Sequence, residues 1–251
     1  MNTQVPGYLY PYVLASAVAV VAAVLTGLNR SLKLARWPET EQRSAFRTIA
    51  TLLLTWAALA FGLSWLGFYQ GPSNGPPTIP FGVGIPLAVG ILLYLRWGTL
   101  QRAIDAVPQS WIVSVQFYRT LGVIFLILLA QGRMPGSFAW PAGVGDVLVG
   151  LLGPMVALAY SRRWPNASRW VRAWNWFGLT DLIAALTTGF LTSPSPWQRL
   201  AFDLPNRLIG AFPLVLVPVF LVPLSILLHL TSLKKLQQAE VEQGVRRPAM
   251  A

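Results

Sequence analysis

Residues 112–129 read IVSVQFYRTLGVIFLILL, and the only charged residue in this run is Arg119. A bilayer core of about 30 Å requires about 20 mostly apolar residues from a helix, so the run predicts a membrane-spanning helix. The whole chain agrees with this prediction, because only 11% of its 251 residues are charged. A soluble domain carries about a quarter of its residues as charges. The chain is therefore expected to be an all-α protein of the lipid bilayer.

Six further runs of this kind are present, which gives seven expected transmembrane helices. Short polar, Gly/Pro-rich or Arg-rich segments separate them and leave no room for a soluble domain. We expect one transmembrane domain over residues 1–232 and a cytoplasmic tail over 233–251 that contains a short surface helix. The seven expected spans are Leu9–Leu28, Ile49–Phe68, Ile79–Leu95, Ile112–Leu129, Ala142–Tyr160, Trp176–Leu191 and Leu208–Leu230.

The basic residues predict how these helices are oriented. Fifteen of the 19 Lys and Arg residues fall in the first, third and fifth connections and the tail, three fall in the other connections, and Arg119 lies within a span. Basic residues of short loops stay in the cytoplasm. The N-terminus is therefore expected outside and the C-terminus inside, in a multi-pass protein of the cytoplasmic (inner) membrane. The net charge of +11 then reflects orientation and contact with anionic lipids, and no nucleic-acid partner is expected.

Short matches between the two halves suggest an internal repeat. Arg36-Trp37-Pro38 in the first connection matches Arg163-Trp164-Pro165 in the fifth. Such a repeat would arrange the seven helices as three, one and three, in parallel triplets like those of SWEET-type transporters. The matching residues are common in this chain, so chance similarity is the competing explanation.

Three ionisable residues lie inside the expected spans: Arg119, Asp146 and Asp181. Such residues are costly in a bilayer unless they are paired or face water, so they mark a candidate functional site. At 1.5 Å per residue, Arg119 and Asp181 lie roughly 15 and 13 Å from the cytoplasmic ends of their spans, and Asp146 roughly 24 Å. Arg119 and Asp181 are therefore expected to pair. Asp146 is expected nearer the outer surface, with Arg133, Arg207, Asn206 or Gln131 as partner.

Two further polar residues join this candidate site. Gln116 and Thr120 share a helix face with Arg119 at the i, i+3 and i+4 spacing. The chain has no cysteine and one histidine, which excludes disulfides, thiolate nucleophiles and the usual Cys/His metal sites. No cofactor, metal or catalytic residue is expected.

Two short motifs have an enzymatic interpretation. Gly143-Val144-Gly145-Asp146 resembles the GxGD signature of intramembrane aspartyl proteases, whose second catalytic aspartate lies on an earlier helix. Here the second candidate, Asp181, lies on a later helix. Ser225 and His229 could form a hydrolase triad with Asp181, although serine in a membrane helix commonly bonds to its own backbone.

Three functions remain open. The first is binding or transport of a small polar solute, proton-coupled or not, through a site between the fourth, fifth and sixth helices. The second is a membrane sensor or interaction subunit in which the intramembrane charges only lock the helices together. The third is an intramembrane hydrolase. Transport requires a water-accessible cavity that reaches the charges, whereas a lock requires a dry and fully paired contact.

Overall fold

The computed structural model describes residues 4–70 and 77–246, and within these ranges the chain is helical and contains no β-strand. Among the described residues, six helical segments are long and apolar enough to cross a membrane. A polytopic membrane protein requires such helices, because the backbone of a spanning segment must satisfy its own hydrogen bonds. The six segments are α1 (Leu9–Leu34), α2 (Glu39–Trp65), α3 (Ile79–Arg96), Gln109–Ala130, α7 (Gly136–Ser161) and Val217–Val241.

The helix over the predicted sixth span, α8 (Ala167–Thr192), is not one of these six. With 26 residues it is as long as α1 and α7, and it packs along α7. Its buried side chains include Asn175 and Asp181, which lower its mean hydropathy. At the position of the predicted sixth span, α8 is thus long enough to cross a membrane but less apolar than the six other segments.

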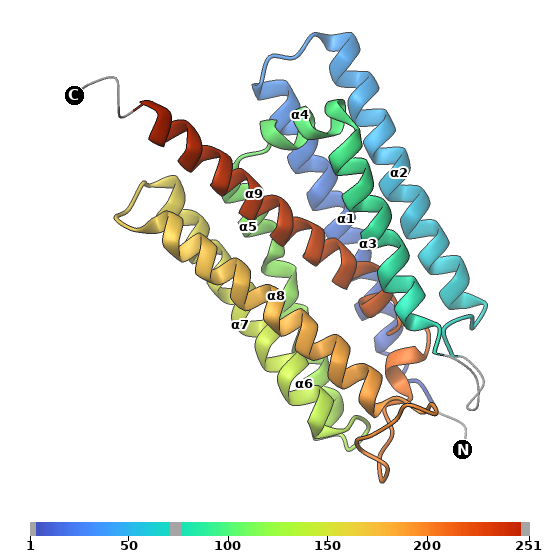
Figure 1. The fold of residues 1–251 in the computed structure, drawn as a ribbon. Helices are drawn as coiled ribbons and strands as arrows, with labels where there is room; N and C mark the ends of the chain where they lie inside the picture. The colour runs from blue at the N-terminus through green and yellow to red at the C-terminus, as the bar shows by residue number, and fades with distance from the viewer. Residues whose placement is uncertain (1–3, 71–76, 247–251) are drawn as a thin grey trace.

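The helices form two groups with the last helix between them (Figure 1). One group contains α1, α2, α3 and the short α4 (Gly98–Ala106). The other contains α5 (Gln109–Val115), the 3₁₀ segment η1 (Gln116–Gly122), α6 (Val123–Ala130), α7 and α8. The last helix, α9 (Val222–Arg246), crosses between the groups and contacts α3, α5 and α8.

The last span differs from its prediction at both ends. Its expected first part forms a 3₁₀ turn, η2 (Leu208–Gly210), then turns, then a π-helical segment, η3 (Val217–Leu221). Pro213 and Pro218 lack the backbone donors that a regular helix needs there. At the other end α9 continues unbroken to Arg246, so residues 233–246 extend this helix instead of forming a separate surface helix. Residues 247–251 of the predicted tail lie outside the described residues.

The fourth span is interrupted in the middle by η1, which lies close against α7. A methyl group on Gly150 would come within 2.5 Å of the Thr120 backbone nitrogen and 3.1 Å of the Phe117 carbonyl oxygen. Only glycine therefore permits this approach, as is common where membrane helices pack closely. The contact fixes η1, and with it Arg119, against α7.

Candidate functional site

Arg119 is the centre of a buried charged cluster, and its side chain is 2% exposed. Its Nε donates a hydrogen bond of 2.7 Å to Oδ1 of Asp146 on α7. Its Nη2 donates to Oδ2 of Asp181 on α8. Its Nη1 lies 3.3 Å from the carbonyl oxygen of Gly178 and 3.1 Å from Nε2 of His229 on α9. One guanidinium group therefore joins η1 to three other helices.

The predicted pairing of Arg119 with Asp181 is confirmed, whereas the predicted surroundings of Asp146 are wrong. Asp146 pairs with Arg119 as well and not with a residue near the outer surface. The predicted depths were counted from the cytoplasmic ends of the spans, as if these ends lay at one level. Counted from the connection that joins the two spans, Arg119 lies eleven residues before Ala130, the end of α6, and Asp146 lies ten residues after Gly136, the start of α7. The two side chains are therefore at a similar distance from that connection and can meet.

A chain of buried polar side chains continues from the cluster through His229. Nδ2 of Asn175 donates to the carbonyl oxygen of Val171 at 2.8 Å, so Oδ1 of Asn175 faces Nδ1 of His229 at 2.9 Å. His229 therefore donates through Nδ1 and accepts from Arg119 through Nε2, which makes it the neutral tautomer. Nδ2 of Asn175 also contacts Oγ of Ser232 at 2.8 Å, and Gln109 reaches the same oxygen at 2.6 Å.

Three glycines make room for the cluster. A methyl group on Gly145 would overlap the carboxylate of Asp181, and one on Gly178 would overlap the ring of His229. A methyl group on Gly122 would lie 2.5 Å from Cβ of Asp146. The side chains of Asp181, His229 and Asp146 thus occupy space that any residue larger than glycine would fill at these three positions.

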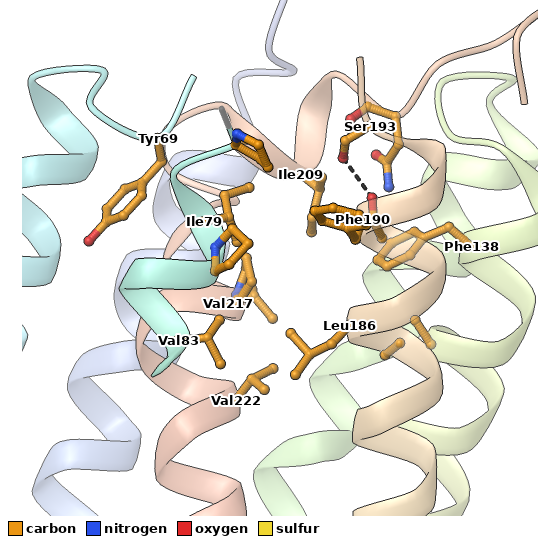
Figure 2. Close-up of a pocket in the computed structure, with 18 of the residues that line it drawn as sticks. Tyr69, Ile79, Val83, Phe138, Leu186, Phe190, Ser193, Ile209, Val217 and Val222 are labelled. Carbon is orange, nitrogen blue, oxygen red and sulfur yellow. Dashed lines mark hydrogen bonds between the residues drawn. The ribbon is translucent and has the colours of Figure 1, made fainter. Parts of the chain in front are cut away.

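A cavity of about 610 Å³ leads from one end of the bundle to Asp146. It opens where α3 begins and α8 ends, which we call the open end of the bundle. Its walls come from both helix groups, and Figure 2 shows Val83 and Val222 facing Leu186 across it. Most of its lining is aromatic or aliphatic. A second large cavity, of about 650 Å³, lies between α2, α3 and α9 and is lined mainly by aliphatic side chains.

Polar groups line the first cavity near its open end. Asn206 is 1% exposed, and neither polar atom of its side-chain amide has a hydrogen-bond partner within the described part of the chain. Buried amides are normally bonded to protein, water or a ligand. Arg207 and Tyr69 are also part of the lining. Burial raises the pKa of Tyr69 above its usual 10.0, so its hydroxyl is neutral.

The other predicted site residues do not join the cluster. Gln116 is fully buried, and neither atom of its amide has a partner among the described residues. Thr120 donates to the backbone carbonyl of Phe117. The polar residues of the site that the sequence did not indicate are Asn175 and Ser232. His229 was considered there only as a triad candidate, and Asn206 only as a partner of Asp146.

The enzymatic motifs do not assemble into catalytic groups. Oγ of Ser225 lies 2.6 Å from the hydroxyl of Tyr118, while both ring nitrogens of His229 contact other partners. Asp146 and Asp181 bind different nitrogens of Arg119 and, within the described ranges, make no hydrogen bond to each other. Among the same residues, no group of three or more His, Asp or Glu side chains could hold a metal ion.

The fold and site define a helical membrane protein with a cavity that ends on a buried Arg–Asp cluster. A family model described as "Domain of unknown function (DUF8737)" matches residues 76–237, and the chain belongs to this family. The match includes the residues of the cluster and of the polar chain, and Asn206 and Arg207.

One curated relative adds a partial similarity. The chain is 35% identical over 102 residues to an undecaprenyl-diphosphatase of Synechococcus sp. (strain WH7803), which corresponds to 38% of this chain and 35% of that protein. The chain therefore spans about a third of the relative's length. No solved structure matches the chain.

Proposed function

We propose that this protein binds a small solute in the cavity between its two helix groups, and that the solute reaches Asp146. The observation that carries this proposal is the unequal exposure of the cluster. The side chains of Arg119 and Asp181 are 2% and 6% exposed, whereas that of Asp146 is 15% exposed and lines the cavity. A purely structural lock would have no reason to leave one of its charges open to a cavity of this size, which lies in the range of ligand pockets.

The proposal includes the topology predicted from the sequence, with α8 as a seventh crossing and the open end of the bundle outside. The polar side chains of α8 point inward to Arg119 and Ser232. Its outward face carries large apolar side chains, as Trp176, Phe177 and Ile183 are 59%, 42% and 63% exposed. Such a helix suits a bilayer despite its low mean hydropathy, because its charges face the protein.

Transport, as opposed to binding, would also require the other end of the bundle to open. There the polar chain Asn175, Ser232 and Gln109 joins α8, α9 and α5 by hydrogen bonds. These bonds can be exchanged for bonds to water or solute at small net cost. We propose this contact as the inner barrier of a transport cycle in which one helix group moves against the other.

Native mass spectrometry of the purified protein tests the binding proposal. We expect a small molecule to co-purify with the wild-type chain. Leu186→Trp fills the cavity (Figure 2) and should remove that mass. Leu148→Trp makes the same change at a 44% exposed position of α7 and should retain it. A wild-type protein without bound mass, or equal retention in both variants, would favour the structural lock.

A second candidate, a membrane hydrolase, is favoured by the partial similarity to undecaprenyl-diphosphatase. The cavity lining includes an arginine, Arg207, that could bind the phosphate groups of such a substrate. Release of inorganic phosphate from undecaprenyl diphosphate by the wild-type protein, lost in Arg207→Met, would replace solute binding by hydrolysis as the proposed function.

A further inference from the structure

The charge of the cluster is unbalanced. Two carboxylates, Asp146 and Asp181, share one guanidinium, that of Arg119, and His229 is bonded as the neutral tautomer. One negative charge is therefore left over when both carboxylates are ionised, and a bilayer interior strongly disfavours such a charge. It must be balanced by a proton or by a cation that enters through the cavity.

We propose that the solute is an organic monocation, an amine with an apolar body, whose ammonium group binds Asp146. This inference rests on the proposed solute site and names its ligand class. Oδ1 of Asp146 accepts the bond from Arg119, whereas Oδ2 accepts no hydrogen bond in the described part of the chain. A carboxylate oxygen has room for further donors, and a charge-assisted bond from an ammonium group is among the stronger ones.

The walls of the cavity suit the rest of such a molecule. Phe125, Phe138, Phe190 and Tyr69 line it, and Figure 2 shows Leu186 on the same side of the cavity as Phe138 and Phe190. Aromatic faces attract cations and pack against apolar groups. A small inorganic cation has no apolar body to pack against these walls, so they favour an organic ligand.

The charges at the two ends of the cavity select against other ligand classes. Asp146 lies at the closed end, and Arg207 lies with Asn206 near the open end. An anionic ligand held by Arg207 would be repelled by the carboxylate of Asp146 and could not extend its charge to the closed end. A molecule with its amine at Asp146 can instead place a hydrogen-bonding group at Asn206, whose amide has no partner among the described residues.

A bound cation and a proton compete for the same charge, so binding is expected to weaken as the pH falls. The charged groups that face Asp146 are Arg119 on η1 and Asp181 on α8, and the neutral but titratable His229 on α9 adjoins it through Arg119. The phenols of Tyr12 and Tyr118 face it across a small void of about 40 Å³. Among these groups the two carboxylates are the ones that can exchange a proton for the ligand.

The test compares three probes with similar bodies and different ends: phenethylammonium, 2-phenylethanol and 3-phenylpropionate. Binding to the purified full-length protein is measured by saturation-transfer NMR and thermal shift. We expect phenethylammonium to bind at least about tenfold more tightly than the other two probes, which corresponds to a difference of about 1.4 kcal/mol in binding free energy. Asp146→Asn should remove this preference. Asp203→Asn, which neutralises an exposed carboxylate outside the cavity lining, should not.

The outcomes separate this inference from the proposed function. Preferential binding of the alcohol or the carboxylate overturns the cation class and leaves the solute site standing. Binding of none of the probes, or binding that is unchanged in Asp146→Asn, also overturns the inference. The solute site itself is tested separately, by the small molecule that is expected to co-purify in native mass spectrometry. If Asp146→Asn does not fold, the wild-type protein alone provides the test. Its preference for phenethylammonium should be present at about pH 8 and lost at about pH 5, and a preference that is absent or independent of pH overturns the inference.

Discussion

Replacing Arg119 by methionine is expected to destabilise the protein by about 3–5 kcal/mol, the usual effect of removing one partner from a buried ion pair. The substitution keeps the length of the side chain but leaves two carboxylates, Asp146 and Asp181, without their shared cation. It also removes the donor to His229. The free energy of unfolding is measured by denaturation of the purified protein in detergent.

Arg47→Met is the matched control, because Arg47 is exposed on α2, and such changes typically alter stability by no more than about 0.5 kcal/mol. Of the two aspartates, Asp181→Ala should destabilise more than Asp146→Ala, since Asp181 is the less exposed of the pair. The triple variant that adds both Asp→Asn changes to Arg119→Met should recover part of the loss. Equal unfolding of Arg119→Met and Arg47→Met would refute the central role of Arg119.

Gly145→Ala is expected to have the second largest effect, a loss of about 1–3 kcal/mol from overpacking. The new methyl group would occupy the space of the Asp181 carboxylate, so either that side chain or α7 must shift. The bond from Arg119 to Asp181 is lost in the first case. The change in unfolding free energy and the binding of phenethylammonium are both measured.

Gly62→Ala separates this steric effect from the general effect of alanine in a helix. Gly62 lies in α2, and a methyl group there meets no atom within 4 Å. Alanine has the higher helix propensity, so this variant should be as stable as the wild type or more stable. If Gly145→Ala behaves like Gly62→Ala, the slot at Gly145 does not determine the geometry of the cluster.

The sequence predicted the membrane class, the position of most helices and the pairing of Arg119 with Asp181. These features depend on hydropathy and on the cost of charge in lipid, which act at the level of single segments. The partner of Asp146 was missed because helical spacing gives distances along one span and does not show how the ends of two spans align.

The roles of the glycines and of the uncharged polar residues were also hidden. Gly145 and Gly178 look like ordinary small residues of membrane helices until the structure shows which side chain fills each slot. Asn206 lies in an irregular connection, where no periodicity indicates that its amide faces a cavity. The internal repeat and the orientation in the membrane remain predictions.

Access of water to the cavity is the most direct test of the account, and the absence of native cysteine makes it clean. Leu186→Cys places a thiol in the cavity lining (Figure 2), and Thr187→Cys places one on the exposed outer face of α8 at nearly the same depth. Intact cells are treated with a membrane-impermeant, positively charged methanethiosulfonate. We expect the thiol at position 186 to react and the one at 187, which would face lipid, to remain unmodified. No reaction at 186, or equal reaction at both positions, would contradict an outward-open cavity that leads to Asp146.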